Sequence, residues 1–177
     1  IRKARGIGLT KVVIAIDTFC SEDLSPQRVC ELSTLATLNG LYRYEDHISE
    51  KSEKTIKEVI LNTAAPAESS VISYTAIAEA INLARDLANA PPNFMTPSIL
   101  SNIAEREAKA NGIEFERLDE DKMRELGMGS LLGVAQGSNE PAHLIILKYI
   151  GDKDNIEDSI ARVGKGITFD SGGLSLK

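Results

Sequence analysis

Residues 163–177 combine side chains and glycines in a pattern that could do chemistry. Lys165 lies between two glycines, a lone Asp170 follows it, and a glycine pair comes soon after. A phosphate-binding loop would need Gly, four residues, Gly-Lys and then Ser or Thr, so that successive amides surround a phosphate. Here Ser159 takes the place of the first glycine, and Gly166 takes the place of the Ser or Thr. The segment is therefore not a phosphate-binding loop of this kind.

Two other chemistries compete for the same segment. A dinucleotide-binding loop needs a third spaced glycine before a helix, whereas Phe169 stands at that position. The order Asp170-Ser171-Gly-Gly resembles the serine-nucleophile segment of chymotrypsin-like proteases. That family is all-β and needs a well-placed His and Asp, while this chain mixes strands with helices. Its two histidines, His47 and His143, are expected to be structural or solvated, so we exclude both chemistries.

Strand and helix signals alternate in the first half of the chain. Residues 11–17 form an apolar, β-branched run that predicts a buried strand. Ser25 and Pro26 are typical of an N-cap and a first helical position, and the helix should reach Gly40 or slightly beyond. The alternating apolar residues of 55–62 predict a second strand. A strand followed by a helix is the signature of an α/β fold.

A long helix is predicted over residues 68–89. Its apolar residues recur at three- and four-residue spacing, and a pair of prolines follows its end. We interpret this helix as a connector between two domains. The expected division is an N-terminal domain over 1–66, a connecting helix over 67–90 and a second domain over 91–177.

The second half of the chain also mixes helices with strands. Thr96 is a candidate N-cap for a helix that should stop at Gly112. The stretch 127–141 is rich in Gly and Ser and predicts a loop. The remaining expected elements are a strand over 113–117, a short helix over 119–126, a strand over 143–150 and another strand over 159–164.

Composition places the chain among folded, mildly acidic proteins. Of 177 residues, 42% are hydrophobic and 26% are charged, with a net charge of -6 and no stripe of basic residues to bind nucleic acid. No window approaches the roughly 18 apolar residues of a membrane span, and no signal peptide is evident. Cys20 and Cys30 give no disulfide framework, so we expect reduced thiols and a cytoplasmic location.

Residues 163–177 closely resemble the metal-binding segment of the leucyl aminopeptidase family, the cytosol aminopeptidases that use two metal ions to remove N-terminal residues from peptides. Residues 83–97, Leu-Ala-Arg-Asp-Leu-Ala-Asn-Ala-Pro-Pro-Asn-Phe-Met-Thr-Pro, are similar to the entry of that family's catalytic domain. Residues 127–138 resemble its glycine-rich loop, and residues 11–54 more weakly resemble the end of its N-terminal domain. These similarities follow one another in the order expected for the family.

The resemblance implies roles for three residues. Lys165 matches a lysine that coordinates one of two divalent metal ions as the neutral amine, and Asp170 matches a carboxylate that bridges both ions. Lys177 matches a second, charged lysine that polarises the scissile carbonyl. The implied cofactors are two zinc or manganese ions, with magnesium as an alternative, and a bicarbonate that shuttles protons in the intact enzyme. The implied partners are peptides with a free N-terminus and further copies of the chain in a hexamer, with no membrane or nucleic acid.

The family's other metal ligands have no counterpart in this sequence. They are a further aspartate and an Asn-Thr-Asp-Ala-Glu-Gly-Arg segment, which would lie beyond position 177. We therefore interpret the chain as an internal α/β fragment of a leucyl aminopeptidase: the end of the N-terminal domain, a linker helix and the start of the catalytic domain. The parent would release N-terminal amino acids such as leucine, and this chain alone should be inactive. The alternative is a noncatalytic binding or assembly module with the same fold.

Overall fold

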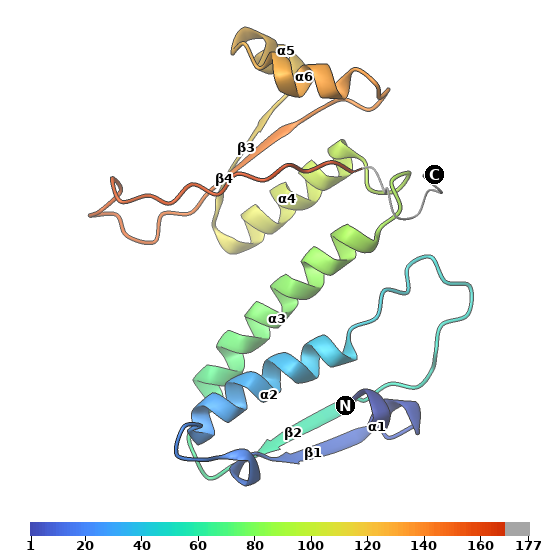
Figure 1. Cartoon of the computed structure of the whole chain (residues 1–177), viewed down its shortest axis with the longest axis vertical. Helices are drawn as coiled ribbons and strands as arrows, with labels where there is room; N and C mark the ends of the chain where they lie inside the picture. The colour runs from blue at the N-terminus through green and yellow to red at the C-terminus, as the bar shows by residue number, and fades with distance from the viewer. Residues whose placement is uncertain (169–177) are drawn as a thin grey trace. The chain divides into compact units, whose positions relative to one another are not determined.

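The structure is a computed structural model that describes residues 1–168, and its chain divides into two compact units (Figure 1). Unit 1 covers residues 1–89, and unit 2 begins at residue 90. Each unit combines helices with a two-stranded sheet, in agreement with the predicted α/β class. Within residues 1–168, no helix has the length and apolar character that crossing a membrane requires.

A parallel pair of strands forms the sheet of unit 1. Strand β1 (Lys11–Ala15) lies beside β2 (Glu58–Asn62), with Val13 opposite Ile60. Both strands fall inside the predicted ranges. Their β-branched residues favour strands because such side chains pack well on a pleated surface. The shorter elements of this unit are the helix α1 (Arg2–Gly6) and the 3-10 helix η1 (Ile16–Phe19).

Two long helices, α2 (Pro26–Leu41) and α3 (Glu68–Asn89), lie side by side in unit 1 (Figure 1). The backbone N–H of Arg28 donates a hydrogen bond to Ser25 Oγ at 3.2 Å, so Ser25 is the N-cap of α2. Pro26 occupies the first helical position, where its missing N–H costs nothing. The structure thus confirms both predicted helices.

The core of unit 1 gathers around Ile16, whose side chain is fully buried. Val29 and Cys30 of α2 pack against it together with Ala67, and partly buried apolar side chains surround this cluster. Both cysteines are free, and burial raises the pKa of the Cys30 thiol, which keeps it protonated and unreactive.

Unit 2 is built on helix α4 (Pro97–Asn111) and an antiparallel pair of strands, β3 (Glu114–Leu118) and β4 (Leu144–Lys148). The N-cap of α4 is Thr96, whose Oγ1 accepts a hydrogen bond from Ile99 N–H at 3.3 Å. Gly112 ends the helix in the left-handed region with φ +65°, a conformation that favours glycine. The predicted helix and both predicted strands are confirmed.

A helix stands where the sequence predicted a loop. Helix α5 (Glu120–Glu125) was expected, but α6 (Gly129–Ala135) occupies the first part of the stretch 127–141. Its side chains Leu131, Leu132 and Ala135 pack against the buried cluster of Leu118, Met123 and Ala142. The prediction was wrong here because these apolar contacts outweigh the low helix propensity of the glycines.

The predicted strand over 159–164 is absent. Residues 149–168 contain no helix or strand, although Ile160 and Val163 are apolar and β-branched. Their side chains are 86% and 98% exposed. A strand needs a neighbouring strand to pair with, and within the described residues this run has none, which is why its local propensity does not produce a strand.

Candidate functional site

The structure describes only the first part of the site predicted from the sequence, residues 163–168, and this part passes beside helix α4. The backbone at Gly166 passes along this helix, because a methyl group placed on Gly166 would lie 3.8 Å from Leu100 Cδ2. Lys165 precedes this point of contact and is exposed to solvent, whereas Thr168 is half-buried. Lys165 is therefore exposed at the surface of unit 2, one residue before the backbone passes the first half of α4.

Asp170 and Lys177, the other two predicted site residues, belong to residues 169–177 and lie outside the described residues. Lys165 is thus the predicted site residue whose position the structure gives.

The described residues do not complete a metal site. Residues 1–168 contain no group of three or more His, Cys, Asp or Glu side chains that could hold a metal ion. An amine nitrogen and a carboxylate, as in Lys165 and Asp170, are donors that divalent transition metals accept. Structural zinc takes about four ligands, and catalytic zinc about three protein ligands with a water. The donor types fit, but their number is too small.

A histidine and a serine connect the start of α4 to the start of β4. His143 Nε2 lies 3.1 Å from Ser98 Oγ, and within residues 1–168 the buried His143 Nδ1 has no hydrogen-bond partner. Burial lowers the pKa of His143, and the nearby Arg117 lowers it further. The imidazole is therefore neutral at pH 7, and its contact holds the N-terminus of α4 in place.

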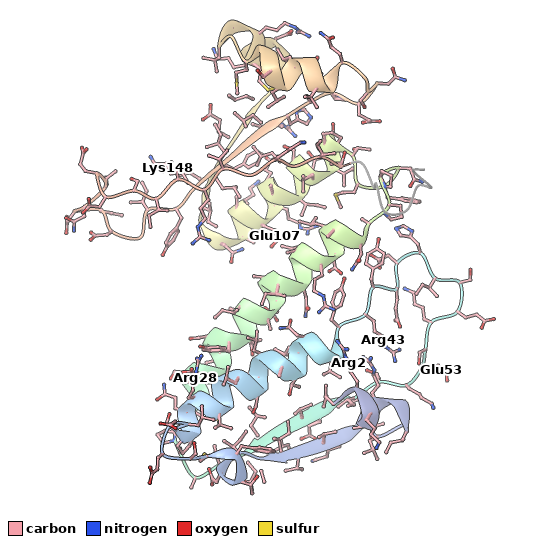
Figure 2. All side chains as sticks on the ribbon, in the orientation of Figure 1. Arg2, Arg28, Arg43, Glu53, Glu107 and Lys148 are labelled. Carbon is pink, nitrogen blue, oxygen red and sulfur yellow. The ribbon has the colours of Figure 1, made fainter. Side chains whose placement is uncertain are left out.

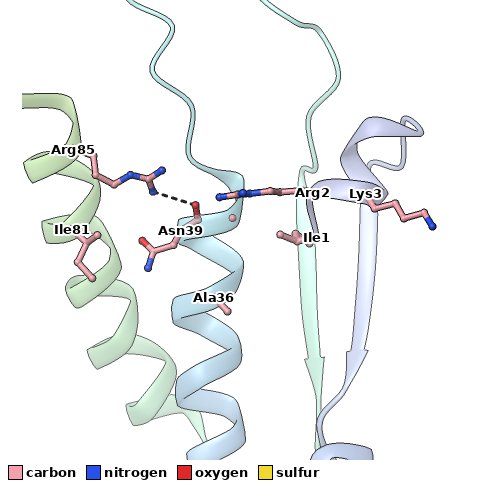
Figure 3. Close-up of a pocket in the computed structure, with 8 residues that line it drawn as sticks. Ile1, Arg2, Lys3, Ala36, Asn39, Ile81 and Arg85 are labelled. Atoms are coloured by element: carbon pink, nitrogen blue, oxygen red, sulfur yellow. Dashed lines mark hydrogen bonds between the residues drawn. The ribbon is translucent and has the colours of Figure 1, made fainter. Parts of the chain in front are cut away.

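A positively charged groove crosses the end of α2 in unit 1 (Figure 3). Its volume is about 640 Å³. Arg2 and Arg85 lie on opposite sides of Asn39 in Figure 3. Sequence reasoning missed this groove because its cations come from helices far apart in the chain. The residues that line it are Ile1, Arg2, Lys3, Ala36, Asn39, Gly40, Ile81 and Arg85.

Sequence comparisons relate the chain to known peptidases. A sequence model described as the cytosol aminopeptidase family, catalytic domain, matches residues 82–177. A probable cytosol aminopeptidase of Nitrosomonas europaea is 49% identical over 116 residues, which are 66% of this chain and 23% of the relative. One from Pseudomonas fluorescens is 37% identical over 179 residues, covering 98% of this chain and 36% of the relative. The chain thus spans between 23% and 36% of the length of these relatives.

Solved structures extend the likeness to the fold. The bottromycin maturation enzyme BotP, solved in complex with Mn, matches with a TM-score of 0.73 and 27% identity over 83% of this chain and 31% of that enzyme. A mutant tomato leucine aminopeptidase matches with a TM-score of 0.79 over 97% of this chain and 35% of that protein. Since its identity is 24%, this second match concerns the fold alone. It supports the predicted leucyl aminopeptidase type of α/β fold.

Proposed function

Because the chain belongs to the cytosol aminopeptidase family, we propose that the full protein is a metal-dependent aminopeptidase that releases N-terminal amino acids such as leucine from peptides. The observation that carries this proposal is the family match over residues 82–177, which includes the Lys165 segment. The manganese in BotP supports metal dependence. Relatives named cytosol aminopeptidases support a cytoplasmic location.

We assign three residues to the site of the full enzyme. Lys165 and Asp170 would be ligands of two divalent ions, and Lys177 would remain charged and hold the peptide carbonyl. Bound ions of this kind polarise a carbonyl and lower the pKa of a bound water. Lys165 is exposed in the described residues, so the neutral amine that a metal ion needs would have to be favoured by the bound ions and by further protein surface of the full enzyme. A cation at Lys177 would stabilise negative charge that develops on the carbonyl oxygen.

The chain of residues 1–177 would be inactive alone, because Lys165 and Asp170 supply too few ligands for two ions. We further propose that the full enzyme is a homo-oligomer, a hexamer as in its family. Large exposed apolar side chains in the described residues, such as Ile72 and Tyr149, support contacts with further protein surface.

The proposal is tested in the full enzyme with two substitutions of different expected effect. Asp170→Ala should abolish both metal retention and turnover, because it removes a ligand shared by both ions. Lys177→Ala should leave the metal content unchanged and lower turnover by about 100-fold or more, as expected for the loss of one charge-stabilising group. Metal content is measured by mass spectrometry and turnover with a leucine anilide. Equal metal loss in both variants would refute the assigned roles, and metal-independent turnover would refute the proposed function.

A further inference from the structure

A polar cluster joins the end of α2 to the last turns of α3 within unit 1. Tyr42 is the C-cap of α2, and its hydroxyl donates a hydrogen bond to Asp86 Oδ1 at 2.7 Å. The same hydroxyl oxygen accepts a hydrogen bond from Asn89 Nδ2 at 3.0 Å. The half-buried phenol thus uses both its donor and an acceptor site, and each bond leads to α3.

Arg85 covers the ring of the same tyrosine. Its guanidinium carbon lies 3.7 Å from the centroid of the Tyr42 ring, well inside the range of a cation-π contact. Nη1 of Arg85 also donates to the backbone oxygen of Asn39 at 3.2 Å (Figure 3). The same nitrogen donates to Asn82 Oδ1, also at 3.2 Å. The hydrogen bonds fix the guanidinium plane over the ring.

The hydrogen bond from Arg85 also gives a partner to a backbone carbonyl at the C-terminal end of α2. The last carbonyls of a helix lack partners within the helix and carry partial negative charge. Helix α2 has no basic residue in its own last turn. Arg85 binds the carbonyl of Asn39, and Arg5 Nη1 binds the carbonyl of Leu41 at 2.7 Å. Cations from other helices therefore cap this end, which anchors α3 to α2.

The cluster joins two parts of the sequence that differ in their relation to the family. Arg85, Asp86 and Asn89 lie inside the region that matches the catalytic-domain model, at its very start. Asn39 and Tyr42 lie before that region. The motif residues at the start of the catalytic region thus contact the preceding part of unit 1.

We propose that Tyr42 is a positioning residue: with Arg85, Asp86 and Asn89 it locks the last turn of α3, which is the start of the region that matches the catalytic domain. The C-terminal turn of a helix frays unless it is held by contacts. A pair of prolines follows at 91–92 and prevents the helix from extending further. The prolines therefore limit how far α3 can extend, and the lock keeps its last turn helical up to that limit. The existence of the lock does not depend on the proposed function, whereas the effect of the lock on turnover rests on the proposed function.

The first test is hydrogen exchange on the full chain with Tyr42→Phe, which keeps the ring and removes the hydroxyl. The amides of residues 86–89 should exchange about 25-fold faster, because two hydrogen bonds are lost and each is worth about fivefold in the opening equilibrium. The matched control is Tyr74→Phe, since Tyr74 lies near the start of α3 and accepts a hydrogen bond from Arg28 at 2.6 Å. It should leave residues 86–89 unchanged. Unchanged exchange in Tyr42→Phe, or equal acceleration in Tyr74→Phe, would overturn the proposal.

A second pair of variants distinguishes the loss of the Tyr42–Asp86 hydrogen bond from a general destabilisation of α3. Asp86→Asn keeps a side-chain oxygen that can accept from Tyr42, so exchange of residues 86–89 should stay within about twofold of the wild type. Asp86→Ala removes the acceptor but leaves the bond from Asn89 to Tyr42, so exchange should rise about fivefold, less than in Tyr42→Phe. Equal acceleration in Asp86→Asn and Asp86→Ala would contradict a lock that works through this bond.

In the full enzyme, Tyr42→Phe should lower kcat with KM unchanged, because a positioning residue affects the placement of the catalytic region and touches no substrate. Faster exchange with unaltered kcat would overturn the positioning role. If the full enzyme had no peptidase activity at all, the proposed function would fail, while the exchange experiment would still decide whether the lock exists.

Discussion

The two units differ in how their elements are held. In unit 1, polar contacts bind α2 to α3 near both ends: Arg28 donates to Tyr74 at one end, and Tyr42 donates to Asp86 at the other. Arg28, labelled in Figure 2, belongs to the first turn of α2. In unit 2, the chain leaves β4 at Lys148 and runs through residues 149–168 without a helix or strand.

The segment that carries Lys165 is therefore the less supported of the two regions. Val163, two residues earlier, is 98% exposed, while a methyl group added to Gly166 would lie 3.8 Å from Leu100 of α4. A site residue can act with precision only if packing fixes its surroundings. The difference is that unit 1 holds its helices by packing and polar contacts, whereas the segment that carries Lys165 is largely exposed in the described residues.

The largest effect on stability should come from a substitution in the buried core of unit 1. Ile16→Ala should lower the free energy of unfolding of unit 1 by about 3 kcal/mol, because it leaves a cavity among buried side chains. The control is Val163→Ala in the exposed segment of unit 2, which should change stability by less than about 0.5 kcal/mol. Urea unfolding measures both. Comparable losses would mean that Val163 is packed and that the contrast between the regions is false.

A smaller loss should follow from removing a helix cap, and it should be similar in both units. Ser25→Ala removes the acceptor for Arg28 N–H, and Thr96→Ala removes the acceptor for Ile99 N–H. Each should cost about 1 kcal/mol. Ser25→Asp keeps an acceptor and should restore most of the stability in urea unfolding. If Ser25→Asp were as unstable as Ser25→Ala, the capping bond would not be the cause.

The smallest effect is a pH dependence of the free energy of unfolding that arises from His143 in unit 2. Burial lowers the pKa of His143 in the folded state, with Arg117 acting in the same direction and Asp119 and Glu120 opposing it. In the unfolded state the pKa returns to about 6.5. Below that pH the unfolded chain binds a proton that the folded chain does not, so stability is present above about pH 6.5 and decreases as the pH falls.

This pH dependence is measured by urea unfolding of unit 2 between pH 8 and pH 5. His143→Gln should flatten the profile, because glutamine has no proton to gain. His47→Gln is the matched control, since His47 lies in unit 1. A profile that His143→Gln leaves as steep as before would show that another group causes the acid sensitivity.

Much of the fold could be predicted where the signals are local. Ser25 followed by Pro26 marked the start of α2. The apolar spacing of 68–89 predicted the helix α3, and the prolines at 91–92 predicted its end. The helix α6 was missed because its stability comes from packing on Met123 rather than from its own glycine-rich sequence. The strand over 159–164 was wrong because strand formation requires a partner that local sequence does not reveal.

The predicted site stays a prediction, because the structure describes only Lys165 among its three residues. Lys165 stood out through its flanking glycines and the family resemblance, but its exposure beside Leu100 depends on tertiary contacts. The lock at Tyr42 gave no signal, because Tyr42 and Asp86 are 44 positions apart and no short spacing links them. Clusters assembled by two packed helices become visible only in the structure.

The central claim is that residues 1–177 carry part of an aminopeptidase site and cannot complete it. The most direct measurement is hydrolysis of a leucine anilide by this chain, verified by mass to end at Lys177, with and without manganese or zinc. We expect no turnover above that of the buffer under either condition. Robust metal-dependent turnover would contradict it, because the missing ligands would then have to come from within these residues or from a second copy of the chain.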